Sequence, residues 1–159
     1  MRDAGVVLDY ALFGAIAQMR YTEAVVTIDV AVLVSIPPRE SLDLLGDIYS
    51  FCAARGWQPE GEAIRVGPWP VRFVAASSAL TTEAMERADT ADFDGVPLRV
   101  VRADYLGVIA LSVGRAKNFA RILALLESGS VTEEAIERLA ALHGLTEAWQ
   151  RFRTRFLDA

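Results

Sequence analysis

The sequence predicts an α/β fold in which helices flank a mixed sheet and the C-terminal half is helical. The stretch 24–34 is rich in valine, which is typical of a buried strand. The pairs Gly67-Pro68 and Asp94-Gly95 each separate two short strand-like runs, a pattern that indicates β-hairpins. From residue 103 onward, apolar residues recur at helical spacing. These three observations together predict the fold class.

Length and charge limit the organisation of the chain and its partners. The chain has 159 residues, of which 53% are hydrophobic, and this is enough for one domain with a real core. We therefore expect a single domain, with an α/β core over 1–101 and a helical part over 102–159. The net charge of −5 argues against a protein that coats nucleic acid, since such proteins carry a basic surplus.

Cysteine usage and hydrophobicity predict the compartment. The single cysteine, Cys52, cannot form an internal disulfide, and its apolar helical surroundings indicate a buried thiol. No apolar run approaches the ~18 to 20 residues that span a bilayer. Asp3 and Asp9 also interrupt the start of the chain, unlike a signal peptide. We expect a cytoplasmic protein that does not bind a membrane.

The N-terminal part is predicted to alternate strands and helices. We expect a strand over 6–13 that ends at Gly14, a short helix over 15–20 and a long strand over 24–34. In that long strand, Asp29 and Ala31 would point to the same face. A helix is expected over 41–55, ended by Gly56.

The rest of the chain is predicted to extend the sheet and then become helical. We expect hairpin strands over 62–66 and 69–75, a helix over 81–87, and a strand pair over 91–93 and 96–101. The range 103–126 is either one long helix or two helices broken near Gly114. The sequence Ser130-Val131-Thr132-Glu133 is interpreted as a capping box that opens a helix ending at His143-Gly144, and 146–157 is expected to be the last helix.

One segment has the spacing of a nucleotide site. Phe13-Gly14-Ala15 is followed by a spacer over 16–28 and then by Asp29-Val30-Ala31-Val32. This arrangement resembles the polymerase-beta superfamily of nucleotidyltransferases. Their pattern is a hydrophobic residue, Gly, Gly or Ser, a spacer, and then two Asp residues that alternate with hydrophobic ones. The resemblance implies that Gly14 and Ala15 lie near a triphosphate and that Asp29 binds metal.

Longer segments are similar to the AbiEii-type nucleotidyltransferase-like proteins of bacteria and archaea. These segments include YTEAVVTIDVAVLV, DFDGVPLRVVRADYL and the turn Gly114-Arg115-Ala116-Lys117-Asn118, which resembles the family's Gly-Arg-x-Lys-Asp. The resemblance covers about residues 8 to 156. It implies a minimal nucleotidyltransferase fold and a toxin–antitoxin or phage-defence role. It also implies a cognate partner protein and, in active members, Mg²⁺, a nucleoside triphosphate and an RNA acceptor.

The sequence departs from that pattern at the residues that the chemistry needs. Two Mg²⁺ ions clamp the attacking and leaving oxygens in nucleotidyl transfer, and Mg²⁺ is held by carboxylate oxygens. Here Ala31 stands in place of the second Asp, and the stretch 69–75, where the family resemblance implies a third acid, contains no acidic residue. Asn118 replaces the Asp that usually follows the lysine. We therefore expect weak or absent catalysis.

Each candidate residue also has an ordinary structural interpretation. Asp29 either binds metal or bonds a loop at the sheet end, and Gly14 either approaches phosphate or only makes a turn. Arg115 and Lys117 are candidate phosphate contacts; Lys117 is the only lysine in the chain. Both could instead lie on a solvated helix face, and His143 is interpreted as a capping or surface residue.

Two functions remain open from the sequence. One is an active or weakly active nucleotidyltransferase that uses Asp29 with a rearranged acid such as Asp9 or Glu23. The other is a non-catalytic binding or regulatory module that keeps the fold. The combination of Asp29 and Ala31 favours the second function.

Overall fold

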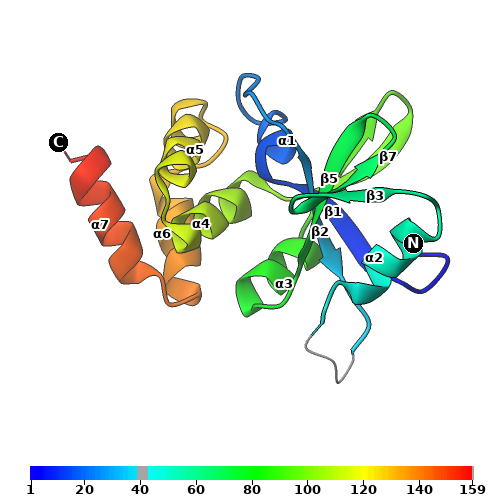
Figure 1. Ribbon diagram of the computed structural model, residues 1–159. Coiled ribbons are helices and arrows are strands. Elements are labelled where there is room, and N and C mark those ends of the chain that lie inside the picture. Colours follow the sequence, from blue (N-terminus) through cyan, green and yellow to red (C-terminus); the bar gives the residue numbers. More distant parts are fainter. Residues whose placement is uncertain (39–42, 159) are drawn as a thin grey trace. The chain divides into compact units, whose positions relative to one another are not determined.

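The computed structural model describes residues 1–38 and 43–158 (Figure 1). The chain forms two compact units. The sheet unit contains Met1–Ala17 and Val25–Val101. The helical unit contains Gln18–Ala24 and the chain from Arg102 onward.

The strands of the sheet unit form one mixed sheet. Within the described residues this sheet has seven strands in the order β3-β4-β5-β2-β1-β7-β6. Their bounds are β1 Asp9–Phe13, β2 Val30–Ser35, β3 Gln58–Glu60, β4 Ala63–Val66, β5 Trp69–Ala75, β6 Asp89–Phe93 and β7 Val96–Val100. The predicted mixed sheet is confirmed. The short edge strand β3 was not predicted.

Strand β2 lies at the centre of the sheet and sets the register for the site. It pairs antiparallel with β1 and parallel with β5. Ala31 therefore lies between Phe13 of β1 and Arg72 of β5. Both predicted hairpins are confirmed, since β4 pairs with β5 and β6 pairs with β7. In the second hairpin, Asp94 and Gly95 have φ of 52° and 80°, which is the left-handed conformation that a tight hairpin turn requires.

A helix covers each face of the central strands (Figure 1). On one face, Ile48 and Cys52 of α2 (Gly46–Ala53) pack in one cluster with Val7, Val34 and Ile64. Burial raises the pKa of the Cys52 thiol, and the predicted buried cysteine is confirmed. The other helix, α3 (Ala79–Glu86), contacts β1 and β2.

The helical unit packs four longer helices around aromatic and aliphatic side chains. They are α4 (Ala103–Val113), α5 (Ala116–Glu127), α6 (Glu133–Leu142) and α7 (Thr146–Phe156). Trp149 is fully buried and stacks on Phe152. Gly114 has φ of 67° and ends α4, so the open alternative of two helices is the one that forms. The cap of α6 is Thr132, whose side chain accepts from the Ala135 N–H, and not Ser130 as the capping-box prediction had it.

The chain between α1 (Gly14–Gln18) and β2 belongs in part to the helical unit. Arg121 Nε donates to Gln18 Oε1 at 3.0 Å, and Ser130 Oγ donates to the Tyr21 carbonyl at 2.6 Å. Gln18 is buried. These bonds attach the segment after α1 to α5 and to the loop before α6.

The prediction of a strand over 24–34 is wrong in its first half. Pairing begins only at Val30, so Asp29 precedes the strand. The Thr27 hydroxyl donates to the Asp29 carbonyl at 2.9 Å, which closes a local turn that competes with strand pairing. The apolar residues that suggested a longer strand are exposed to solvent. Val26 is 100% and Ile28 87% accessible.

Other element ends differ by a few residues. The strand expected over 6–13 begins at Asp9, because Gly5 and Val6 donate to the carbonyls of Arg2 and Met1 and close a turn. The helix expected over 41–55 occupies Gly46–Ala53, and residues 41–42 lie outside the described part. The helix expected over 81–87 begins at Ala79, because Ser78 caps it. None of the helices described is both long enough and apolar enough to cross a membrane.

Candidate functional site

Gly14 and Ala31 meet where β1 turns into α1. Gly14 has φ of 64°, and a Cβ built on it would lie 3.1 Å from the Ala31 Cβ. The turn therefore requires glycine both for its backbone conformation and for its close approach to β2. Ala31 is only 2% exposed, and Ala15 follows in the first turn of α1.

The carboxylate of Asp29 is bonded to an arginine of the neighbouring strand. Arg72 Nε donates to Asp29 Oδ2 at 2.8 Å, and the two side chains are 33% and 26% exposed. Although Asp29 precedes β2, its side chain thus reaches the register partner of Ala31 on β5. Paired residues of adjacent strands point to the same face, so Arg72 lies beside Ala31.

Arg72 was not identified as a site residue from the sequence. The alternation within 69–75 places Arg72 and Val74 on one face and Val71 and Phe73 on the other. That pattern does not show which residue of β2 lies alongside. Only the parallel register places Arg72 next to Ala31, on the strand where the family resemblance implies a third acid.

The donor set does not fit a pair of Mg²⁺ ions. Mg²⁺ requires oxygen ligands in near-octahedral geometry, and catalysis by two metals needs acids that both ions share. Here the positions hold Asp29, Ala31 and Arg72, so one carboxylate faces one cation and a methyl group. No group of three or more His, Cys, Asp or Glu side chains that could hold a metal occurs among the residues described. An arginine in this place would also repel a divalent cation.

Asp9, one of the two acids suggested for a rearranged metal site, does not lie beside Asp29 in the sheet unit. Asp9 pairs with Ser35, four residues along β2 from Ala31, which corresponds to roughly 13 Å of strand. Its carboxylate is bonded to Arg99 and lies 3.9 Å from Arg2. Glu23 is exposed and belongs to the helical unit.

The other predicted nucleotide contacts are in the helical unit. Arg115 is the N-cap residue of α5, and Lys117 lies in the first turn of that helix. Both are exposed, and neither makes an ion pair with a described residue. Asn118, at the position of the family's Asp, is buried, and its Oδ1 has no partner in the part of the chain that is described. His143 is the C-cap residue of α6.

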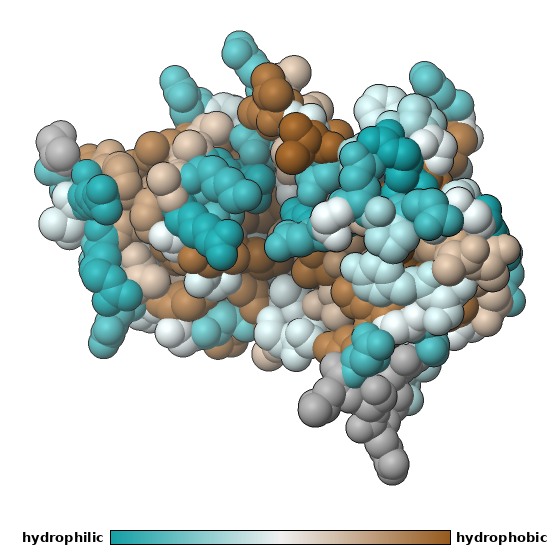
Figure 2. Space-filling view, in the orientation of Figure 1, coloured by the Kyte–Doolittle hydropathy of each residue, from teal (hydrophilic) through white to brown (hydrophobic). Residues whose placement is uncertain are grey.

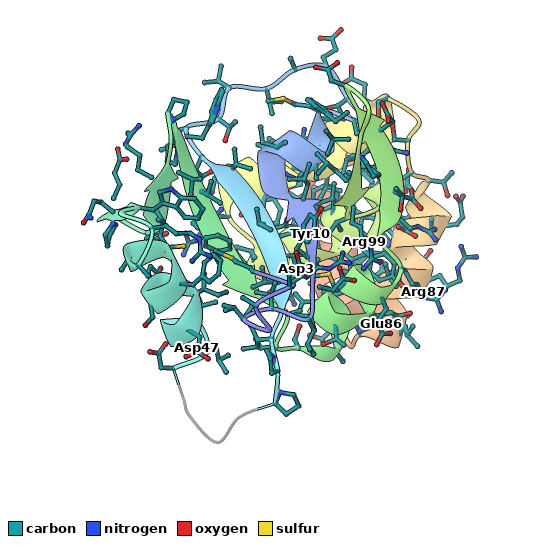
Figure 3. All side chains as sticks on the ribbon, turned by 90° about the vertical axis from the view of Figure 1, so that its right-hand side faces the viewer. Asp3, Tyr10, Asp47, Glu86, Arg87 and Arg99 are labelled. Carbon is teal, nitrogen blue, oxygen red and sulfur yellow. The ribbon has the colours of Figure 1, made fainter. Side chains whose placement is uncertain are left out.

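A cavity of about 390 Å³ lies on the opposite face of the sheet. Val32 and Val34 line it, and their side chains alternate with Ala31 and Leu33 along β2. Asp3 and Tyr10, which also line it, are labelled near the centre of Figure 3. None of the residues predicted to act on a nucleotide contributes to this cavity.

The loop before Asp29 exposes apolar side chains. Figure 2 shows strongly hydrophobic atoms at the top of the view, over the loop between α1 and β2. Among the large apolar residues of this loop, Val26 and Ile28 are the most exposed. They are not part of the core, so their exposure explains why a hydrophobic pattern was misleading there.

Comparisons with known proteins support the fold. No family model and no curated protein matches the sequence. An antigenic nucleotidyltransferase-like protein from Paracoccidioides brasiliensis aligns with 94% of this chain and 87% of its own, with a TM-score of 0.51 and 12% identity. ANT(2")-Ia in complex with adenylyl-2"-tobramycin aligns with 98% of this chain and 92% of its own, with a TM-score of 0.52 and 13% identity. The solution structure of the antibiotic-resistance factor ANT(2'')-Ia aligns with 97% and 91%, with a TM-score of 0.51 and 12% identity. The chain therefore has a nucleotidyltransferase-like fold.

Proposed function

We propose that this protein is a non-catalytic member of the nucleotidyltransferase fold that acts by binding. The observation that carries the proposal is the bond between Arg72 Nε and Asp29 Oδ2 beside Ala31. Asp29 is the one acid that remains from the usual set of metal-binding carboxylates, and this bond pairs it with a cationic side chain of the protein itself. A site of this composition has no second carboxylate to bridge two metal ions, and losing such a clamp removes several kcal/mol of transition-state stabilisation, on the order of a 100-fold loss of rate or more.

The AbiEii-type resemblance supports a biological setting for the proposal. In a toxin–antitoxin or phage-defence system, a nucleotidyltransferase fold without catalytic activity would serve as a binding or regulatory component for a cognate partner protein. Active members of the fold act on nucleoside triphosphates, so we propose that the ligand retained is a nucleotide. Gly14, Ala15, Arg115 and Lys117 remain the predicted contacts for it.

A transfer assay tests the loss of catalysis. Wild-type protein is incubated with each labelled nucleoside triphosphate, with Mg²⁺ or Mn²⁺, and with total RNA as acceptor. We expect no labelled product above the level of a heat-inactivated sample. Metal-dependent labelling by the wild type that Asp29→Asn abolishes would contradict the proposal.

Restoring the acids provides a second readout that does not depend on activity. The double variant Ala31→Asp/Arg72→Asp places three carboxylates together, so its folded state should be destabilised without metal and stabilised by Mg²⁺ or Mn²⁺. Thermal unfolding with and without metal should show a rise in Tm for this variant and none for the wild type. The single variant Ala31→Asp is the matched control, because its new carboxylate would pair with Arg72. A wild-type protein that gains as much Tm from metal as the double variant would show that Asp29 already binds metal.

A further inference from the structure

The guanidinium of Arg72 has unused hydrogen-bond donors. Its Nε is bonded to Asp29, and the two terminal nitrogens, Nη1 and Nη2, have no hydrogen-bond partner among the described residues. The side chain is one third exposed, so these donors can reach a ligand from solvent. Nε of Arg72 is thus bonded within the protein, while Nη1 and Nη2 can donate to a ligand.

This arrangement suits an anion. A guanidinium is planar and always charged, and its paired N–H groups match the oxygens of a phosphate. Asp29 accepts from Nε and so restricts the plane of the fork, which reduces the entropy lost when a ligand binds. The site that holds cations in catalytic relatives would then hold the ligand's phosphate directly.

We propose that Arg72 binds a phosphate group of a nucleotide without a metal ion, with Asp29 as its positioning residue. This inference rests on the proposed function, since it names the ligand chemistry of the same site. The arginine supplies the positive charge that the metal ions supply in two-metal sites. Because no metal joins the protein to the phosphate, chelation of metal should not release the ligand.

Asp29 has two opposing effects on such a ligand. Its carboxylate orients Arg72, but it also places a negative charge next to the phosphate, and like charges at this range repel. Asp29→Asn keeps an oxygen that accepts from Nε and removes the charge. We therefore expect this variant to bind phosphate several-fold more tightly. A metal site titrated with Mg²⁺ in place of EDTA predicts the reverse, because an amide is a poorer ligand for Mg²⁺ than a carboxylate.

Calorimetric titration in EDTA tests the proposal. The probes are the four nucleoside triphosphates, pyrophosphate and adenosine, each titrated into the full chain. We expect binding of triphosphates and of pyrophosphate, and none of adenosine. Arg72→Ala should weaken binding about tenfold or more, since a charge-assisted bond to phosphate contributes at least that factor. Arg72→Lys keeps the charge but lacks the planar pair of N–H groups. Its affinity should lie between those of the wild type and Arg72→Ala.

Arg65→Ala is the matched control. Arg65 lies on β4, next to β5, and both of its terminal nitrogens are already bonded, Nη1 to the Pro68 carbonyl and Nη2 to Glu60. Its removal should leave phosphate affinity unchanged. Far-UV circular dichroism of every variant confirms that each is folded before titration.

The possible outcomes separate this inference from the proposed function. Equal affinity in the wild type and Arg72→Ala would overturn the role of Arg72. Binding of pyrophosphate but of no nucleotide would support phosphate recognition and reject a nucleotide as its source. A protein that neither transfers nucleotide nor binds any phosphate in EDTA overturns this inference and the nucleotide ligand, but leaves the proposed loss of catalysis standing. Metal-dependent transfer overturns the loss of catalysis as well.

Discussion

Two aspartate–arginine pairs in the sheet unit have the same chemistry and different surroundings. Asp9 of β1 is bonded to Arg99 of the adjacent β7, and Asp29, just before β2, is bonded to Arg72 of the adjacent β5. Arg99 also donates from Nη2 to the carbonyls of Met85 at 2.8 Å, Glu86 at 3.3 Å and Ala88 at 3.4 Å. Figure 3 shows Arg99 beside Tyr10, close to the helix end where Glu86 and Arg87 lie.

The difference in hydrogen-bond partners indicates which arginine stabilises the fold and which is available to bind a ligand. Arg99 uses both terminal nitrogens, Nη1 on a carboxylate and Nη2 on carbonyls at and just after the end of α3, where a positive charge also opposes the negative end of the helix dipole. Arg72 fills one donor only. The number of donors left open, and not the presence of an ion pair, distinguishes a fold-stabilising arginine from a candidate binding group.

Removing Arg99 should have the largest effect on stability. Arg99→Ala leaves Asp9 without its closest partner and removes the guanidinium that bonds the carbonyls at the end of α3. We expect a loss of about 2 kcal/mol, which lowers the Tm by roughly 4 to 8 °C in a chain of this size. Thermal and urea unfolding measure it. An unchanged Tm would show that the network around Arg99 contributes nothing and would remove the contrast with Arg72.

Ala31→Asp should have an intermediate effect. Ala31 is buried against Gly14, so a larger side chain there costs about 1–3 kcal/mol, and pairing with Arg72 offsets part of that cost. The same substitution should cost more in an Arg72→Ala background. Urea unfolding of the two single variants and the double variant measures this coupling. Additive losses would show that Arg72 does not reach position 31.

Arg72→Ala should have the smallest effect on stability. The pair is partly exposed and is formed by one hydrogen bond, and such pairs contribute up to about 1 kcal/mol. We expect a Tm within about 3 °C of the wild type. A loss as large as that of Arg99→Ala would identify Arg72 as structural and would weaken its assignment as a ligand-binding residue.

Local signals in the sequence predicted the elements whose structure is decided locally. Trp69–Ala75 and its turn at Gly67-Pro68 were predicted with the observed bounds of β5, because turn chemistry and strand composition lie within a few residues. Asp94-Gly95 gave the second hairpin for the same reason.

Features that depend on distant partners could not be predicted. Val26 and Ile28 have strand composition but lie outside β2, because Thr27 forms a turn and the segment Gln18–Ala24 belongs to the helical unit. The parallel register that sets Arg72 beside Ala31 joins residues 41 positions apart, and no local pattern encodes it. The most informative residue of the candidate site was therefore the one that the sequence did not indicate.

The placement of Gln18–Ala24 determines how the polypeptide can be divided. A fragment ending at Val101 would retain this segment but lose Arg121 and Ser130, the residues that bond it. The Gln18 amide, only 4% exposed in the intact protein, would be left without its partner. A fragment starting at Arg102 would lack the segment altogether. No single cut of the polypeptide therefore yields the two units with all of their segments.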